Sequence, residues 1–563
     1  MHLAGQPSGA WYSRSVRVWS GVVLLGVVAC SGDSRPPLLG STDTSEAGAA
    51  SDTTAFIEPF ISPDDDPTTC DEAAQWQSYV GCDFWPTVVA NNVWSIFDYA
   101  VVVANAGTAA ASVTITGPFG TNQSKTVAAN ALGTFYLPWV PALKGPDSDE
   151  CGSSMPLTAS VIAPASAYHL VSSVPVTVYQ FNAIEYVGRG GPPGKEWSSC
   201  PGNQMCTNGP NKGIAVGCFS FTNDSSLLLP STALTANYRV TAYPGQSSGP
   251  PAPVMPITAS YIAITGIAPT TNVQVLVAPS GDILAGTGVQ ATAGGQELDL
   301  TLNSGDVAEL TSDLGAQFDL SGSLITADQP IQVISGAPCD DVPEDKAACD
   351  HLEQSVFPAE TLGTQYFVPM PSGPLGHPVA HVVRIFGNVD GTTLTYAPAM
   401  PPGCAATIDA GQVIDCGEVD TDFEVTGTNA FSVATFMLGG TVVDPSGGEG
   451  DPSQSLMASV EQYRTKYVFL APSDYDINLI DVVVPSGTTM VLDGKIVDWG
   501  VETPIADGYD VWRLDLPGAN TSAHVLEATT GVGVQVLGYG LFTSYQYPAG
   551  LNLKRIAPPP PLK

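Results

Sequence analysis

Residues 349–358 read Cys349-Asp350-His351-Leu352-Glu353-Gln354-Ser355-Val356-Phe357-Pro358. The segment begins at a cysteine, carries ionisable side chains in its first half and ends at a proline. Leu362-Gly363 follows as a turn signal, and the run Tyr366-Phe367-Val368 comes directly after it. A polar segment bounded by Pro and Gly and followed by aromatic and β-branched residues is typical of a loop that leads into a strand. The sequence around this segment is therefore interpreted as β-structure.

The ionisable residues of this segment have two interpretations. Of the histidines, His351 is the one that stands beside carboxylates, Asp350 and Glu353, so the group could act as a general acid and base. Alternatively, a disulfide-held corner uses polar side chains to pair with the amides of its own turn. The second interpretation is favoured here, which makes the segment a structural element.

The segment resembles a motif of the N-terminal domain family of the IgGFc-binding proteins, which are mucus-associated in animals and have many secreted bacterial relatives. The resemblance is clearest from about Tyr168 to Phe436. It implies a non-catalytic surface protein. The residues that carry it are Asp350, His351, Glu353, Gln354, Pro358 and Gly363.

The N-terminus has the features of a bacterial lipoprotein signal. Arg14 and Arg17 precede a short apolar run, and Val27-Val28-Ala29-Cys30 resembles a lipobox. The apolar run is shorter than the roughly 20 residues that a membrane-spanning helix needs. We therefore expect a signal peptide over residues 1–29 and a lipid-bearing Cys30 that anchors the chain at the outer membrane or cell surface. A periplasmic or secreted location is the alternative.

The cysteine count favours an oxidising compartment. The chain has 11 Cys, and removing Cys30 leaves an even set. Short separations suggest three local disulfides, and the other four cysteines are expected to form two more without a defined pairing. Zinc is disfavoured because no paired C-x-x-C motifs occur. The three local pairs are Cys70–Cys82, Cys339–Cys349 and Cys404–Cys416, and the other four are Cys151, Cys200, Cys206 and Cys218.

The net charge of the chain restricts the classes of partner that we expect. With 54 acidic and 18 basic residues, the formal net charge is −36, which disfavours nucleic-acid binding. Only 13% of residues are charged and 44% are hydrophobic, so the chain is not a disordered acidic polymer. Residues 30–69, rich in Ser, Thr, Asp, Gly, Ala and Pro, are expected to form a flexible tether between the lipid and the folded part.

The fold class follows from period-two patterns. Segments such as 97–103 and 113–116 alternate in polarity and are separated by Asn/Gly turns, as in β-hairpins. Four tetrapeptides recur at similar positions, and successive starts after the second lie about 100 residues apart. They are Pro175-Val176-Thr177-Val178, Pro330-Ile331-Gln332-Val333, Ala430-Phe431-Ser432-Val433 and Gly533-Val534-Gln535-Val536.

A second repeat consists of two segments in which four residues have identical spacing. Pro230, Leu234, Tyr238 and Val240 match Pro358, Leu362, Tyr366 and Val368 in spacing. We therefore predict an all-β chain of tandem β-sandwich modules with disulfides, and a propeller-like repeat is the alternative. The predicted modules are 70–225 with a Cys-rich insertion, 226–345, 346–440 and 441–550, followed by a Pro-rich tail, 551–563.

Other candidate chemistry is weak. Gly245-Gln246-Ser247-Ser248-Gly249 fits the G-x-S-x-G hydrolase pattern, but prolines follow where a helix must begin. His377 and His381 have helical metal spacing within a β pattern. The sequence predicts no cofactor, and a structural calcium ion at the acidic loop between Cys339 and Cys349 is the one alternative kept open. Its ligands would be Asp340, Asp341, Glu344 and Asp345.

Together these patterns predict a non-catalytic cell-surface lipoprotein that acts in adhesion or in binding an extracellular glycoprotein, a polysaccharide or another cell-surface protein. No nucleic acid is expected as a partner, and the membrane is expected to be contacted through the lipid alone. A structural envelope spacer without a specific ligand is the first alternative. A secreted hydrolase using Ser247, Asp350, His351 and Glu353 is the second.

Overall fold

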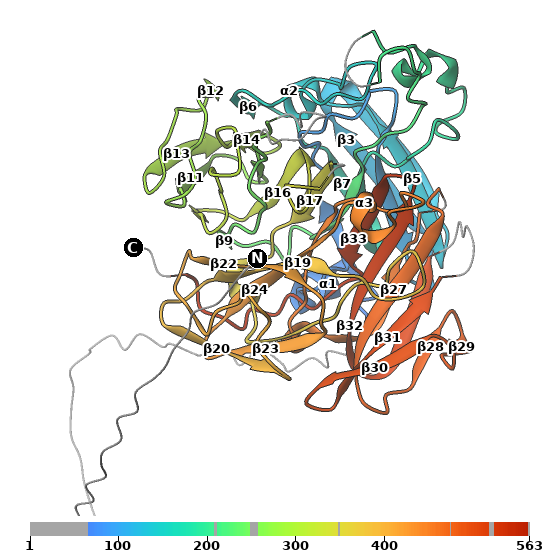
Figure 1. The fold of residues 1–563 in the computed structure, drawn as a ribbon, viewed down its shortest axis with the longest axis vertical. Coiled ribbons are helices and arrows are strands. Elements are labelled where there is room, and N and C mark those ends of the chain that lie inside the picture. Colours follow the sequence, from blue (N-terminus) through green and yellow to red (C-terminus); the bar gives the residue numbers. More distant parts are fainter. Residues whose placement is uncertain are drawn as a thin grey trace, which may run out of the picture. The chain divides into compact units, whose positions relative to one another are not determined.

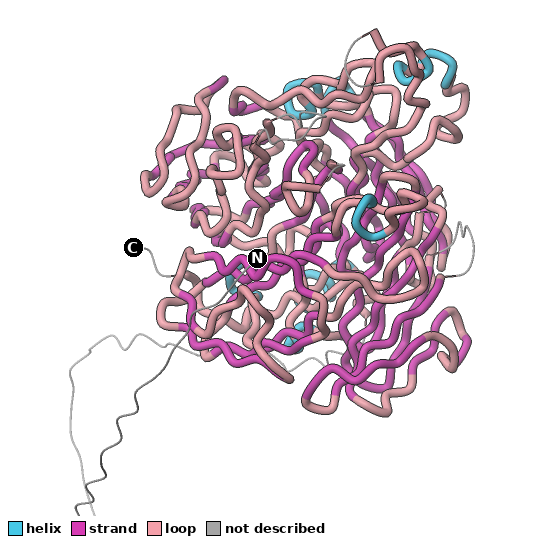
Figure 2. The backbone as a smooth tube through the Cα atoms, viewed as in Figure 1, coloured by secondary structure: helices cyan, strands magenta, loops and turns pink. Residues whose placement is uncertain are grey.

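Nearly all the regular structure is β-strand, as the alternating patterns predict (Figure 2). The computed structural model describes residues 66–207, 211–247, 257–346, 349–472, 474–516 and 523–560. Within these ranges three short helices occur, and the seven-residue α1 begins at a capping box in which Thr69 and Glu72 pair. The all-β prediction is confirmed. The helices and 3₁₀ turns are α1 (Cys70–Trp76), α2 (Pro141–Lys144), α3 (Gly440–Val443), η1 (Pro118–Gly120), η2 (Trp197–Ser199), η3 (Pro201–Asn203), η4 (Ala359–Thr361) and η5 (Val460–Gln462).

The strands form four groups, called blades 1 to 4 below. Blade 1 contains β1 (Gly81–Phe84), β2 (Tyr99–Asn105), β3 (Ala111–Gly117), β4 (Thr121–Val127), β5 (Ala131–Leu137), β7 (His169–Asn182) and β8 (Asp224–Leu228). Blade 2 contains β6 (Ser160–Ala163), β9 (Asn237–Arg239), β10 (Tyr261–Gly266), β11 (Thr271–Leu276), β12 (Gly286–Thr287), β13 (Glu297–Leu302), β14 (Val307–Thr311), β15 (Leu324–Ala327), β16 (Ile331–Asp340) and β17 (Asp350–Ser355).

Blades 3 and 4 follow in sequence. Blade 3 contains β18 (Gln365–Val368), β19 (His381–Gly387), β20 (Thr392–Ala397), β21 (Thr407–Ile408), β22 (Val413–Val419), β23 (Phe423–Gly427), β24 (Phe431–Met437) and β25 (Gln454–Leu456). Blade 4 contains β26 (Arg464–Phe469), β27 (Ile477–Pro485), β28 (Met490–Leu492), β29 (Lys495–Ile496), β30 (Val501–Ala506), β31 (Tyr509–Asp515), β32 (His524–Gly540) and β33 (Thr543–Pro548).

Blades 2 and 3 are β-sandwiches. In blade 2 a six-stranded sheet, β12-β6-β14-β10-β16-β17, packs on a four-stranded sheet, β13-β11-β15-β9. Ile262 and Ile264 of the first sheet share one apolar core with Val273 and Val275 of the second. Along β13 every second residue is buried, which gives one face to the core and the other to solvent.

In blades 1 and 4, one long strand serves two sheet halves. The first part of the 14-residue β7 pairs with β3, and its second part pairs with β2 and β8. The 17-residue β32 likewise pairs with β26 and β28 through its first part, then with β27 and β33. A strand that passes from one sheet to the other in this way makes the corner of a folded sheet.

The four recurring tetrapeptides occupy one structural position. Each begins the stretch of strand that pairs with the last strand of its blade, and that stretch belongs to β7, β16, β24 or β32. In blades 2 and 3 the long strand is interrupted at residues 328–330 and 428–430, the last of which is the first residue of the tetrapeptide. The sequence repeat therefore reports a repeated strand arrangement.

The last strands of the four blades meet. β8 contacts β17, β17 contacts β25, β25 contacts β33, and β33 contacts β8. Figure 1 shows the blades following one another in sequence order around these strands, from blue through green and orange to red. The result combines both predicted arrangements, sandwich modules and a propeller-like repeat. β17 and β25, the closing strands of blades 2 and 3, lie beyond residues 345 and 440, where the sequence places the module ends.

Among the described residues, four disulfides hold loops near the ends of strands. Three of them join the pairs expected from short spacing, Cys70–Cys82, Cys339–Cys349 and Cys404–Cys416. The fourth, Cys200–Cys218, closes the Cys-rich insertion of blade 1. Cys151 and Cys206 are buried thiols outside these bonds.

Candidate functional site: a buried polar hub

The four closing strands enclose a cluster of polar side chains, called the polar hub below. Its members come from β8, β17, β25 and β33 and from the residues that flank them. Their side chains are buried, with Asp224, Asp350, His351 and Glu353 each at 0% exposure. The polar hub consists of Asn223, Asp224, Asp350, His351, Glu353, Ser453, Gln454, Ser544 and Gln546.

Asp224 of β8 joins three blades through one carboxylate. Its Oδ2 accepts hydrogen bonds from the backbone N–H groups of Glu353 in blade 2 and Gln454 in blade 3, both at 3.1 Å. Its Oδ1 accepts from the Ser453 hydroxyl at 2.9 Å and from the Ser225 amide at 2.8 Å. Because these donors lie on three different chain segments, a single side chain fixes their relative positions.

Asp350 and Gln546 complete the connections. The Asp350 carboxylate accepts from the backbone N–H of Asn223 in blade 1 at 2.6 Å and of Ser544 in blade 4 at 3.3 Å. Gln546 of β33 donates to the Ser453 carbonyl of blade 3 at 2.6 Å. Each blade is therefore hydrogen-bonded at the polar hub to at least two others.

Glu353 and His351 lie on the same face of β17. The Nε2 atom of His351 lies 3.3 Å from Oε2 of Glu353. Glu353 also accepts from Gln180 at 2.6 Å and from Asn182, both on β7 of blade 1. The Glu353 carboxylate thus joins blade 1, and the His351 imidazole contacts Glu353 and the Tyr261 ring of its own blade.

Burial dominates the electrostatics of the polar hub. Loss of solvation raises the pKa of Asp224 well above its usual range, although hydrogen bonds from Gln454, Ser225 and Ser453 oppose this shift. The pKa of Asp350 is raised well above its usual value by burial and, second, by the nearby Asp451 carboxylate. Burial also raises the pKa of Asp451. Burial therefore favours the protonated form of all three carboxyl groups.

The geometry of the polar hub supports the structural interpretation of residues 350–354. A general acid or base must reach a substrate atom within about 3 Å. Asp350, His351 and Glu353 are enclosed by four strands and hydrogen-bonded to protein groups, so they face no solvent-filled cleft. Gln354 is also buried, on the same strand. What this arrangement can do is hold four blades in register.

Pro358 and Gly363 belong to a turn that recurs in three blades. The Gly363 amide donates to the Tyr366 hydroxyl at 3.1 Å, and that hydroxyl donates to the Phe431 carbonyl at 2.6 Å. A Cβ on Gly363 would lie 2.2 Å from the Ser459 hydroxyl, so only glycine allows this approach. The Pro358 carbonyl accepts from the Thr361 amide at 2.9 Å and begins the turn.

Tyr238 and Tyr467 make the same contacts as Tyr366. Each accepts from the amide three residues before it, and each donates to the carbonyl of Ile331 or Val532 near the recurring tetrapeptide. The predicted echo between Tyr238 and Tyr366 is thus a repeated hydrogen-bond pattern. These three side chains are called the turn tyrosines below.

The acidic loop gives its carboxylates protein partners. Asp340 accepts from the Thr258 hydroxyl, and Asp341 accepts from the Gln246 amide group at 2.5 Å. Glu344 accepts from the Ser247 amide at 2.7 Å, and Asp345 pairs with Lys346 at the surface. Among the described residues, no group of three or more His, Cys, Asp or Glu side chains is placed to hold a metal ion.

The remaining candidate residues from the sequence, Ser247, His377 and His381, do not belong to the polar hub. The Ser247 hydroxyl accepts from the Ala316 amide at 3.0 Å, and residues 248–256, where a helix would have to begin, lie outside the described residues. His381 is buried in β19, where burial lowers its pKa to about 3, whereas His377 is exposed in a loop. Cys30 and the signal segment lie outside the described residues.

Sequence reasoning missed Asp224, Ser453, Gln454 and Gln546. A usable signal exists in the sequence. When the three segments are aligned on their turn tyrosines, polar residues stand four and five positions before the first residue of each turn. Ser225-Ser226 precede Pro230, Glu353-Gln354 precede Pro358, and Gln454-Ser455 precede Ser459 at this spacing.

Two hollows at the surface of blade 2 share Asp299. One is a groove of about 460 Å³ across the outward face of β11, β13 and β15, and the adjoining one has about 420 Å³. We call the first the outer groove. Its polar side chains pair with one another, as in Asn272 with Asp328 at 2.7 Å and Gln274 with Asp299 at 3.2 Å. It is lined by Asn272, Val273, Gln274, Asp299, Leu300, Thr301, Thr326, Ala327 and Asp328.

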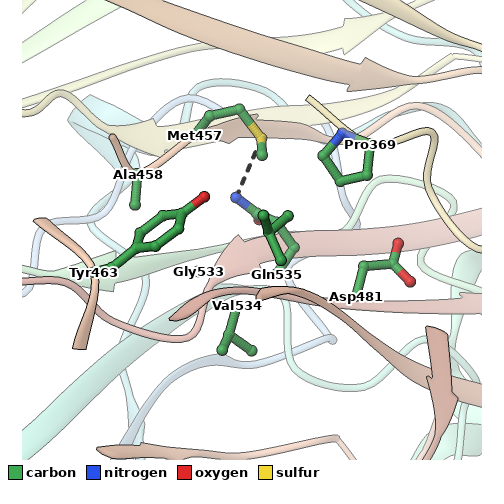
Figure 3. A pocket seen from close by; sticks show the side chains of 9 residues that line it. Pro369, Met457, Ala458, Tyr463, Asp481, Gly533, Val534 and Gln535 are labelled. Carbon is green, nitrogen blue, oxygen red and sulfur yellow. Dashed lines mark hydrogen bonds between the residues drawn. The ribbon is translucent and has the colours of Figure 1, made fainter. Parts of the chain in front are cut away.

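A further hollow lies between blades 3 and 4. Figure 3 shows Met457, Tyr463, Gln535 and Asp481 around it, with the Gln535 amide nitrogen 3.5 Å from the Met457 sulfur. It is small and mainly apolar, so it is a packing defect between blades rather than a ligand site.

A family model described as IgGFc binding protein matches residues 224–538. This is more than half of the chain. The chain belongs to the IgGFc-binding protein family. The match begins at Asp224, runs past Phe436 and includes the polar-hub residues of blades 2 and 3, together with the outer groove.

The human IgGFc-binding protein is 25% identical over 352 residues, which cover 60% of this chain and 6% of that relative. The chain thus spans a small part of the human protein's length. No solved structure matches the chain.

Proposed function

We propose that this chain is a non-catalytic surface protein that binds glycans, carried by extracellular glycoproteins or polysaccharide. The observation that carries the proposal is the burial of the polar hub. Because Asp350 and Glu353 of the family-like motif hold the blades together and His351 is buried beside them, ligand recognition falls to the outward faces.

The outer groove is the proposed binding face. It presents amide, hydroxyl and carboxylate groups on a rigid sheet, and its volume of about 460 Å³ lies within the range of small-ligand sites. Gln274 donates to Asp299 at 3.2 Å, and Asn272 accepts from the Thr301 hydroxyl at 3.3 Å, so these side chains are oriented before a ligand arrives. Sugar hydroxyl groups both donate and accept, and amide and carboxylate side chains match both roles.

The location is proposed from the N-terminal sequence. A lipid on Cys30 and the tether of residues 30–69 would present the blades at the cell surface. Within the described residues, no helix has both the length and the apolar character needed to cross a membrane. The net charge of −36 disfavours nucleic acids and polyanionic surfaces as partners.

Binding is tested on a glycan and glycoprotein array with the full chain, and immunoglobulin Fc is included because it appears in the relative's name. We expect binding that falls at least tenfold in Gln274→Ala and in Asp299→Ala. The matched control is Thr395→Ala, an exposed position on an outer strand of blade 3, which should bind like the wild type. A silent array contradicts the proposal and favours an envelope spacer. Binding that survives both groove substitutions contradicts the assignment of the groove.

Location is tested separately. Intact cells are treated with protease, and the chain is followed by antibody together with its Cys30→Ser variant. We expect wild-type protein to be cleaved on the cells and the variant to appear in the medium. Full protection of the wild-type protein contradicts the surface location.

A further inference from the structure

Two buried cysteines lie where the Cys-rich insertion of blade 1 meets the segment after α2. Cys206 is 3% exposed and Cys151 is 7% exposed. The Cys206 sulfur lies 3.9 Å from the Glu150 carbonyl oxygen, next to Cys151 in sequence. The Thr207 hydroxyl donates to the Glu150 carboxylate at 2.6 Å. Residues 150–151 and 206–207 therefore lie side by side.

The two thiols themselves are neighbours. The Cys206 thiol interacts with the Cys151 thiol, and burial, followed by this interaction, raises the pKa of Cys206 to about 11. Sulfur atoms within hydrogen-bonding range need only a small side-chain rotation to reach bonding distance.

Local hydrogen bonds fix both backbones. The Asp149 carboxylate accepts from the amides of Cys151 and Ser153, both at 2.9 Å. The Cys206 amide donates to the Ile214 carbonyl at 2.9 Å, and its carbonyl accepts from Gly213 at the same distance. The approach of the two cysteines is thus built into two ordered turns.

The surroundings are oxidised. The other cysteines of the described residues are all in disulfides, and Cys200–Cys218 closes the same insertion. A pair of adjacent thiols in a chain that otherwise carries disulfides is a substrate for the same oxidation.

We infer that Cys151 and Cys206 form a fifth disulfide, which ties the insertion to the segment after α2. A donor protein disulfide supplies the oxidant: one cysteine attacks it as a thiolate, forming a mixed disulfide, and the second cysteine displaces the donor. The two thiols lose two protons and two electrons, and the donor leaves as a dithiol. Because both sulfurs are buried in the final fold, the exchange takes place while the insertion is still folding.

Peptide mapping of the full chain, secreted through an oxidising compartment, tests this inference. The protein is unfolded without reductant, its thiols are alkylated, and the digest is analysed by mass spectrometry. We expect residues 151 and 206 in one cross-linked species, two hydrogen atoms lighter than the sum of its peptides. Recovery of both cysteines in alkylated form, or of either in another linkage, overturns the inference.

Two substitutions distinguish a disulfide between Cys151 and Cys206 from two thiols that only pack together. Cys151→Ser should expose one new thiol, at position 206, and Cys206→Ser should expose one at position 151. Each should speed proteolytic cleavage between residues 184 and 223 severalfold, and the double variant should behave like either single one. Cleavage rates that add up in the double variant contradict a shared bond.

Discussion

The polar hub and the outer groove are both rich in Asp and in side-chain amides, yet they differ in burial, in hydrogen bonding and in the direction in which the pKa of their carboxyl groups is shifted. In the polar hub, Asp224 is fully buried, accepts four hydrogen bonds and has a raised pKa. In the outer groove, Asp328 is exposed, binds Asn272 alone, and these hydrogen bonds lower its pKa. The same residue type therefore builds a scaffold in one place and is exposed to solvent on the proposed binding face in the other.

The largest expected difference between the two regions concerns one substitution made in each. Asp224→Ala leaves four buried donors from three blades without an acceptor, and we expect a loss of about 4 kcal/mol in the free energy of unfolding. Asp328→Ala removes exposed hydrogen bonds and should cost about 0.5 kcal/mol. Urea unfolding of both variants measures this, and equal losses would remove the distinction.

The buried acids predict a pH dependence. Burial, and second the Asp98 charge, raise the pKa of Glu185 to about 8, and Asp224, Asp350 and Asp451 are also raised. The folded chain then keeps protons that the unfolded chain has released, so stability falls as pH rises from 7 to 8. Each retained proton contributes about 1.4 kcal/mol per pH unit. His381, with its pKa lowered to about 3 in the folded chain, is neutral there over this window and mostly neutral in the unfolded chain, so it opposes this trend only slightly.

Urea midpoints at pH 7 and pH 8 check this expectation. Glu185→Gln cannot titrate and should make the slope less steep, whereas Glu297→Gln, at an exposed position of β13, should leave it unchanged. A stability that rises over this interval would mean that the buried carboxyl groups are ionised in the folded chain.

The turn tyrosines give a smaller, repeated effect. Tyr238→Phe, Tyr366→Phe and Tyr467→Phe each remove a hydroxyl that joins an amide to a carbonyl. We expect about 1–2 kcal/mol for each, of similar size because the contacts are equivalent. Thermal unfolding compares the three, and a large effect confined to one blade would show that the repeat is not energetically equivalent.

Chelation should have the smallest effect. Asp340 and Asp341 accept hydrogen bonds from Thr258 and Gln246, so we expect the acidic loop to keep its order without a cation. We expect no measurable change in melting temperature when EDTA is added to the full chain. A clear fall that calcium reverses would restore the calcium site considered from the sequence.

Much of the fold could be predicted because it depends on patterns among residues that are close in sequence. The alternation of polar and apolar residues predicted the strands. The short separations between cysteines predicted the disulfides Cys70–Cys82, Cys339–Cys349 and Cys404–Cys416. The recurring tetrapeptides marked one strand position in each blade.

The polar hub could be predicted only in part because its bonds are long-range. Asp224 binds Glu353 and Gln454, which lie more than a hundred residues away in sequence, and no local pattern reports such pairs. A polar strand such as Ser225-Ser226 looks like a solvated one until three other strands cover it. The family-like motif was located, but its partners had to come from the topology.

Hydrogen–deuterium exchange of the full chain tests the central claim, that the closing strands hold four blades as one scaffold. The account predicts that amides of β8, β17, β25 and β33 are the slowest to exchange and do so together, and that Asp224→Ala speeds all four. Fast exchange in β17 while the other three stay protected, or four blades exchanging independently, would contradict it.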